Sequence, residues 1–119
     1  MFDKKMGLIE SQFADIIWKE EPLRTAELVK ISENKFNWKR TTTYTVLKRL
    51  SERGLFQNCN GWVTSLVSRE EFYSVQSEKF VEDAFAGSLP AFLAAFTSRK
   101  ELTADEIAEI RKIIDSKEA

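Results

Sequence analysis

WKRTTTYTVLKRLSERG, from Trp38 to Gly54, predicts an α-helix with two chemically different faces. Steps of three and four residues bring together a predicted buried face made of Thr43, Val46, Leu47 and Leu50. The opposite face carries hydroxyls near its start and long charged side chains further along: Thr41, Thr42, Thr45, Lys48, Arg49 and Glu52. Gly54 follows the last turn, where a helix commonly ends in a left-handed residue.

The polar face is suited to the major groove of DNA. Threonine can bond a base edge or touch a thymine methyl, and arginine can bind guanine through two hydrogen bonds. Four of the five residues from Thr41 to Thr45 are threonines, which are poor helix formers, so a role other than helix stability is indicated. We therefore predict DNA contacts by Lys39, Arg40, Thr41, Thr42, Tyr44, Thr45, Lys48 and Arg49.

Plainer interpretations of the same residues stay open. The segment could be an ordinary amphipathic helix with a solvated basic face. The hydroxyls of Thr42 and Thr45 could bond back to the carbonyl four residues earlier, and Tyr44 could serve half-buried packing.

Length and composition predict a soluble globular protein. The chain has 119 residues, 43% hydrophobic and 31% charged, which fits one domain or a small domain with an appendage. No apolar run reaches the length of a membrane span, and the N-terminus does not resemble a signal peptide, so we expect a cytoplasmic protein. The single cysteine, Cys59, cannot form an internal disulfide; we expect a structural thiol, although pairing with its mate across a dimer stays open.

The residue inventory argues against catalysis. With no histidine and one cysteine, neither a protein-built zinc site nor a Ser/His/Asp or Cys/His arrangement is expected. No glycine-rich phosphate-binding loop is present. An enzyme would have to use carboxylates and lysines, and the acids lie in helical patterns typical of solvated faces. We predict a non-enzyme without cofactor or metal.

Charge is unevenly distributed along the chain. Residues 1–67 hold 11 lysines and arginines against 8 acids, whereas residues 68–119 hold 7 against 11, so the net charges are +3 and −4. Residues 35–53 alone carry six basic residues and one acid, a net charge of +5. A basic segment on a mildly acidic protein is typical of a local nucleic-acid contact.

The first half of the chain predicts a helix-turn-helix. An apolar stripe of Ile9, Phe13, Ile16 and Ile17 indicates a first helix over residues 8–19, which Pro22 prevents from continuing. Thr25 is a candidate N-cap for a second helix over 26–34, and 34–37 is the expected turn before the basic helix. Three short helices with a basic third helix are typical of this motif.

The period changes to that of strands after Gly54. Residues 55–59 and 62–67 predict two strands, and Asn60-Gly61 between them is a strong hairpin signal. A hairpin after a recognition helix is the wing of a winged helix. The tip, 58–61, has no lysine or arginine, so we expect a weak grip on phosphate; a lid over the helical core is the alternative.

The last third predicts amphipathic helices. Ser68 to Glu71 has the form of a capping box and opens a long helix to about Ala86; another helix begins near Pro90, and Thr103 with Glu106 caps the last one. The apolar faces of these helices are too large to stay exposed to solvent. A second copy of the chain would bury them, unless the helices fold back onto their own domain. The predicted dimerisation residues are Phe72, Phe80, Phe85, Leu89, Phe92, Leu93, Phe96, Ile107, Ile110 and Ile114.

The expected fold class is therefore mainly α with a small β-hairpin: a winged helix-turn-helix DNA-binding domain, 1–67, followed by a helical dimerisation region, 68–119. Several segments in this order resemble the penicillinase/methicillin-resistance repressor family of bacterial winged-helix regulators, and the related copper-responsive repressors. They are Glu10–Trp18, Thr25–Leu28, Asn37-Trp38 with Thr42, Thr45, Leu50 and Gly54-Leu55, Ser68–Phe72, Phe85–Leu89, and Leu102–Ile114. The resemblance covers nearly the whole chain.

The resemblance implies a homodimer that binds an inverted-repeat operator and represses transcription, with Thr41, Thr42, Thr45 and Arg49 at the DNA. Three features depart from the pattern. Resistance repressors are cleaved at an Asn-Phe bond, for which Ala95-Phe96 is the nearest match; the C-terminal cysteines of copper repressors are absent; and the wing is short and lacks a basic tip. What releases the protein from DNA, an unknown inducer or a protease, is not indicated.

A rival hypothesis keeps the fold and changes the partner. The small net charge and the uncharged wing tip also fit a winged-helix module that binds another protein, as an anti-repressor or adaptor, without specific readout of DNA.

Overall fold

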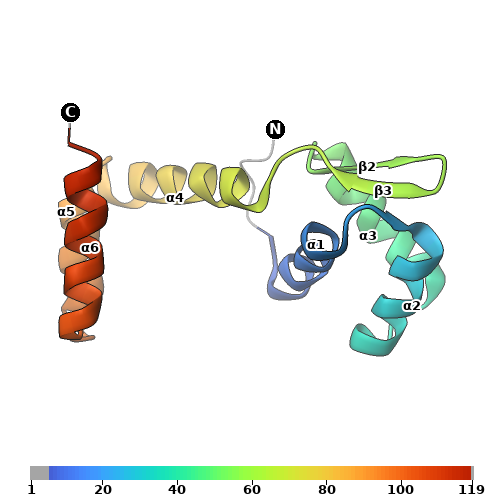
Figure 1. Cartoon of the computed structure of the whole chain (residues 1–119), viewed down its shortest axis with the longest axis horizontal. Helices are drawn as coiled ribbons and strands as arrows, with labels where there is room; N and C mark the ends of the chain where they lie inside the picture. The colour runs from blue at the N-terminus through green and yellow to red at the C-terminus, as the bar shows by residue number, and fades with distance from the viewer. Residues whose placement is uncertain (1–5, 119) are drawn as a thin grey trace. The chain divides into compact units, whose positions relative to one another are not determined.

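The computed structural model describes residues 6–118, which form six helices and three short strands (Figure 1). The prediction of a mainly α chain with a small β element is confirmed. No helix in this described range combines the length and apolar character needed to span a bilayer. The elements are α1 (Leu8–Glu20), β1 (Leu23–Arg24), α2 (Thr25–Phe36), α3 (Arg40–Glu52), β2 (Phe56–Cys59), β3 (Trp62–Ser65), α4 (Arg69–Phe85), α5 (Leu89–Thr97) and α6 (Ala104–Ser116).

The chain divides into two compact units, which we call the N-terminal unit, up to Lys79, and the C-terminal unit, from Phe80. The division falls inside α4, so the first part of this helix belongs to the N-terminal unit and its end to the C-terminal unit. The functional assignment of 1–67 to DNA binding and 68–119 to dimerisation stays a prediction.

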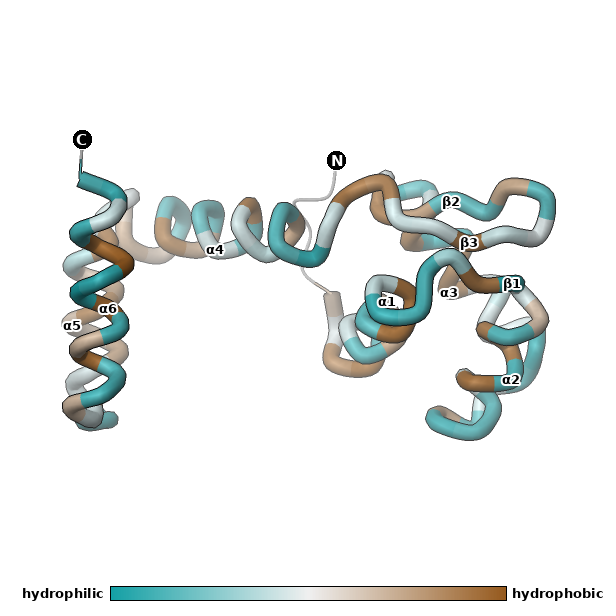
Figure 2. The backbone as a smooth tube through the Cα atoms, viewed as in Figure 1, coloured by the Kyte–Doolittle hydropathy of each residue, from teal (hydrophilic) through white to brown (hydrophobic). Residues whose placement is uncertain are grey.

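The N-terminal unit has a well-formed apolar core. The inner face of α1 is buried through Phe13, Ala14, Ile16 and Ile17, as its apolar stripe predicted, except that Ile9 remains 45% exposed. Figure 2 shows hydrophobic segments recurring along the helices and strands of this unit. The other core residues are Leu23, Leu28, Val46, Leu47, Leu50, Leu55, Phe56, Val63 and Phe72.

The sheet has three strands rather than the predicted two. The hairpin forms with Asn60 and Gly61 at positive φ, as predicted, but β1 pairs antiparallel with β3 and gives the order β1-β3-β2. Leu23 lies opposite Val63 and Arg24 opposite Trp62. A strand of two residues has no alternating pattern to detect, so sequence periodicity could not predict it.

The second helix is longer than predicted, and its cap is different. Arg24 occupies the N-cap position, so the prediction that Thr25 caps this helix is wrong; Thr25 is its first residue. Glu27 closes this end because its carboxylate accepts a hydrogen bond from the Arg24 amide at 3.2 Å. The predicted turn at 34–37 is also displaced, since the helix continues to Phe36 and only Asn37, with φ 57°, is left-handed.

Phe72 does not have the place predicted for it. Its side chain is 1% exposed in the core of the N-terminal unit, with its ring centre 5.8 Å from that of Trp18 and 5.0 Å from that of Tyr73. A buried ring has no surface left for a second chain, so Phe72 is removed from the predicted dimerisation residues. The first turn of α4 thus completes the N-terminal core.

The C-terminal unit, in contrast, buries little. None of its residues from Phe80 to Glu118 is fully buried. The ring centre of Phe92 lies 6.0 Å from that of Phe80, 5.7 Å from that of Phe85 and 6.2 Å from that of Phe96. Four half-exposed phenylalanines in contact form a cluster whose outer surface is open to solvent.

Candidate nucleic-acid interface

The two faces of α3 are those that the sequence predicted. Thr43, Val46, Leu47 and Leu50 are buried at 1%, 6%, 3% and 0% exposure. The predicted DNA-contacting side chains lie outside this buried face, with Tyr44 half-buried and the rest exposed: Lys39, Arg40, Thr41, Thr42, Thr45, Lys48 and Arg49. The pattern of burial along α3 therefore leaves these side chains accessible to a ligand, whereas their contact with DNA stays a prediction.

Tyr44, near the start of α3, is close to Thr25 at the start of α2 and to Arg40. A side-chain hydrogen bond with Thr25, followed by the effect of the Arg40 guanidinium, lowers the pKa of Tyr44. The Arg40 guanidinium carbon also lies 5.5 Å from the centre of the Tyr44 ring. Tyr44 therefore positions a cation at the N-terminus of α3. This role is additional to the DNA contact and the half-buried packing that the sequence suggested for Tyr44.

Thr45 makes the local bond that was the alternative to base contact. Its hydroxyl donates to the Thr41 carbonyl oxygen at 2.8 Å. This bond uses the hydroxyl proton, but the side chain is exposed and its oxygen keeps an acceptor lone pair. Such a threonine can still accept from a base amino group or touch a thymine methyl.

Arg49 is held by an acid that sequence reasoning missed. Its Nη1 atom donates to Glu10 Oε2 of α1 at 3.0 Å, with the Arg49 side chain 55% exposed and that of Glu10 22% exposed. The two residues are 39 positions apart, so no local pattern links them. An open depression beside this ion pair is lined by Thr45, Lys48, Glu52 and Arg53.

The sheet adds a basic residue to the uncharged wing. The guanidinium carbon of Arg24, on β1, lies 4.8 Å from the centre of the Trp62 ring, on β3. The wing also borders α3, because Asn58 lines one depression together with Tyr44, Leu47 and Lys48. Sequence reasoning did not include Arg24, since its approach to the hairpin depends on the unpredicted strand β1.

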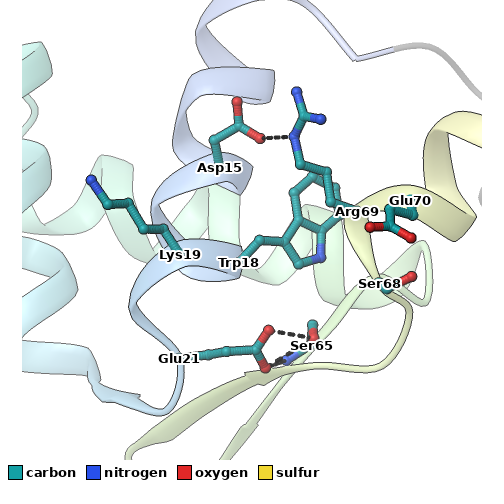
Figure 3. A pocket seen from close by; sticks show the side chains of 8 residues that line it. All are labelled: Asp15, Trp18, Lys19, Glu21, Ser65, Ser68, Arg69 and Glu70. Carbon is teal, nitrogen blue, oxygen red and sulfur yellow. Dashed lines mark hydrogen bonds and ion pairs between the residues drawn. The ribbon is translucent and has the colours of Figure 1, made fainter.

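The junction between α1, β3 and α4 is fixed by polar contacts (Figure 3). Trp18 Nε1 donates to the Val67 carbonyl oxygen at 2.9 Å, and Arg69 Nε donates to Asp15 Oδ1 at 2.8 Å. The Asp15 carboxylate raises the pKa of Arg69. The Glu21 carboxylate accepts from the amide and hydroxyl of Ser65. The cavity of about 460 Å³ at this junction is lined in part by these bonded groups, together with the charged side chains of Lys19 and Glu70.

The predicted dimerisation residues of the C-terminal unit differ in exposure. Phe80, Leu89, Phe96 and Ile114 are 41%, 51%, 50% and 52% exposed, which keeps them available to a second chain. Phe85, Phe92, Leu93, Ile107 and Ile110 are partly buried. Cys59 is exposed at the end of β2. Within residues 6–118, no group of three or more potential ligands is arranged to hold a metal ion.

Comparisons with known proteins relate this chain to repressors. The sequence profile described as penicillinase repressor matches residues 6–116. The chain is 26% identical over 110 residues to the penicillinase repressor of Bacillus licheniformis, covering 89% of this chain and 86% of that protein. It is 24% identical over 112 residues to the methicillin resistance regulatory protein MecI of Staphylococcus aureus strain Mu50, covering 91% of each. MecI of Mammaliicoccus sciuri is 23% identical over 112 residues, with the same coverage.

Proposed function

The chain belongs to the penicillinase repressor family, and we propose that it is a transcriptional repressor that binds double-stranded operator DNA as a homodimer. The observation that carries the proposal is the outer face of α3, which combines exposed threonines with exposed cations while the opposite face packs into the core. An exposed basic helix on a packed three-helix scaffold has the form of a recognition helix.

The roles on this helix follow from side-chain chemistry. Thr41, Thr42 and Thr45, with Arg40 at the helix start, are assigned to base edges because short hydroxyls and a nearby cation can enter the groove. Phosphate or guanine is assigned to Lys39, Lys48 and Arg49 because long cations reach the backbone on either side. Tyr44 positions Arg40 and is close enough to that surface to bond a phosphate.

Dimerisation is supported by the state of the C-terminal unit. Its phenylalanine cluster and the apolar residues of α5 and α6 remain open to solvent, and a patch of this kind is stabilised when a second copy covers it. Two recognition helices about 34–36 Å apart would then meet successive major-groove faces of an inverted repeat.

Selection from a randomised duplex library at two salt concentrations tests the proposal. We expect enrichment of an inverted repeat whose half-sites are about one helical turn apart. The variant Thr41→Ala/Thr42→Ala should lose the enriched sequence while keeping salt-sensitive attraction to DNA. Weak binding by the natural chain with no enriched sequence would mean that the basic helix attracts DNA without reading it, and would favour the protein-binding alternative.

A further inference from the structure

The wing hairpin has no charge of its own. Residues 55–67 contain neither lysine nor arginine, and also no acid. A neutral hairpin next to a recognition helix has no cation with which to hold the phosphate backbone. A cationic contact from the wing must therefore come from a basic residue of another element.

Strand β1 places Arg24 beside the wing hairpin. Its partner in the antiparallel register is Trp62, and its guanidinium carbon lies 4.8 Å from the centre of the Trp62 ring. The guanidinium also reaches the hairpin turn, since Arg24 Nη1 lies 3.8 Å from where a Cβ of Gly61 would be. Trp62 is 45% exposed and Arg24 is exposed, so the pair lies at the surface of the wing.

The backbone around Arg24 is held on both sides. Leu23, the residue before it, is 2% exposed in the core, and the Thr25 amide after it donates to the Gly61 carbonyl oxygen at 3.0 Å. A cation fixed in this way loses less conformational freedom on binding than a lysine at a mobile loop tip.

The charge of Arg24 is not neutralised within the described part of the chain. Two of the ion pairs there join Glu10 to Arg49 and Asp15 to Arg69, and the Glu27 carboxylate contacts the backbone amide of Arg24. A guanidinium that stacks on an aromatic ring keeps its edge donors available, and their fork matches the geometry of a phosphate.

The Arg24 surface continues into the proposed DNA-reading surface. Thr25, next to Arg24, is close enough to Tyr44 to lower the pKa of its hydroxyl, and the Arg40 guanidinium carbon lies 5.5 Å from the centre of the Tyr44 ring. Thr25 and Tyr44 therefore lie between Arg24 and Arg40. A duplex that meets the start of α3 lies within reach of the wing at this point.

We propose that Arg24, stacked on Trp62, binds a DNA phosphate beside each half-site and gives the wing the cation that its own sequence lacks. This rests on the proposed function, because it assumes that the outer face of α3 meets DNA. The contact is to the backbone, so it is independent of base sequence.

The test compares the salt dependence of binding for the full chain and its variants, on a duplex carrying the selected inverted repeat and on a shuffled duplex of the same composition. Each phosphate contact contributes about 0.9 to the slope of log affinity against log salt concentration. A dimer has two Arg24 side chains, so Arg24→Ala should lower the slope on the repeat by about 1.8 and weaken both duplexes.

Two variants keep this test specific. Arg24→Lys retains the charge and should restore most of the slope, whereas Lys19→Ala removes the same charge from the exposed end of α1, beside the junction cavity, and should leave the slope unchanged. Thermal unfolding of each variant checks that the fold is retained.

The possible outcomes separate the two proposals. An unchanged slope for Arg24→Ala, or weakening on the repeat alone, overturns the phosphate assignment and leaves the repressor proposal in place. A natural chain without sequence preference, whose slope on shuffled DNA still falls with Arg24→Ala, overturns the repressor proposal and supports the phosphate contact. No binding of either duplex by the natural chain overturns both.

Discussion

Arg49 has two potential partners, the Glu10 carboxylate that it already contacts and the DNA that it is proposed to contact. Any move of its guanidinium onto guanine or phosphate must weaken the bond to Glu10, now 3.0 Å long. Exposed ion pairs of this kind contribute about 0.2–1 kcal/mol, so the competition is modest in size. We therefore expect Glu10 to limit the DNA affinity of α3 without contacting DNA itself.

The first prediction is that Glu10→Gln tightens DNA binding. The amide removes the competing charge but can still accept the hydrogen bond that Glu10 receives from the Gly7 amide. The gain should be up to about fivefold for each half-site, which corresponds to about 1 kcal/mol for an exposed ion pair. Titration of operator and shuffled duplexes measures it.

Glu20→Gln is the matched control, because Glu20 is an exposed acid on the same helix and lies outside the contacts of α3 described above. Equal tightening by both variants would mean that only net charge matters.

The variant Arg49→Ala distinguishes the two roles proposed for Arg49. If it weakens operator binding by about 1–3 kcal/mol and relaxes specificity at one base position, Arg49 reads guanine. If it weakens binding to operator and shuffled DNA equally, Arg49 contacts a phosphate.

The second prediction concerns Thr43, on the buried face of α3. Its hydroxyl is buried and has no hydrogen-bond partner in the described structure, at a position that is 1% exposed. Thr43→Val replaces the hydroxyl by a methyl group of similar shape and should raise the free energy of unfolding of the N-terminal unit by about 1 kcal/mol. Urea denaturation measures the change, and DNA affinity should stay constant.

Thr43→Ala removes the hydroxyl and the methyl group together and leaves both spaces empty, so it should be less stable than the valine variant. A valine variant less stable than the natural chain would show that the hydroxyl has a partner in solution. This residue also shows what a sequence can predict: its burial followed from local helical spacing, whereas its missing partner depended on packing against other elements.

At the scale of elements, helices that are marked by local signals were predicted well. The burial of α3 follows from steps of three and four residues, and the predicted box at the start of α6 is present, with Thr103 and Glu106 bonded to each other's amides at 3.1 and 3.0 Å. Strand β1 depends instead on β3, some 40 residues later, and has no local signal. The place of Arg24 in the candidate site could not be predicted for the same reason.

The third prediction is that Thr103→Ala weakens α6. The Thr103 hydroxyl accepts from the Glu106 amide at the helix start, and loss of such a cap costs about 1 kcal/mol. Because α6 carries predicted dimerisation residues, the dimer should dissociate at higher protein concentration. Sedimentation equilibrium measures the shift, and Thr103→Ser, which keeps the hydroxyl, should restore the natural value.

The same cap predicts a dependence on pH. The Thr103 amide, followed by its side chain, lowers the pKa of Glu106. Because the folded-state pKa lies below the unfolded one, this contribution is complete above the unfolded pKa and is lost as the pH falls through the folded value. The loss on acidification should be smaller in Glu106→Gln, as measured by circular dichroism.

At the scale of the whole molecule, the two units differ in how they are stabilised. The N-terminal unit closes a core of thirteen buried hydrophobic residues, whereas none of the residues from Phe80 to Glu118 is fully buried. Along α6, hydrophobic segments alternate with hydrophilic ones (Figure 2), and Ile113 and Ile114 remain 59% and 52% exposed. This excess of apolar surface could be predicted from the sequence pattern. The prediction wrongly included Phe72, because the pattern does not show whether a phenylalanine packs into the N-terminal core or lies in the C-terminal unit.

The last prediction is that Leu89→Asp makes the protein monomeric. Leu89 is 51% exposed at the first position of α5, where an aspartate is compatible with the helix because it lies near the N-terminal amides. The variant should therefore keep its fold while placing a charge on the predicted interface. Phe92→Asp should also give monomers, but it disturbs the phenylalanine cluster as well, so Leu89 is the cleaner position.

Sedimentation and DNA titration of the same samples test the dimer and its link to binding. Without a dimer, the two half-sites are bound independently, so affinity for the inverted repeat should fall by about 100-fold or more while affinity for a single half-site stays the same. Ala91→Asp puts the same charge on the opposite face of α5, at an exposed position, and should remain dimeric. A Leu89→Asp protein that stays dimeric would move the interface away from this face of α5, and monomers with undiminished affinity for the repeat would mean that binding does not depend on the dimer.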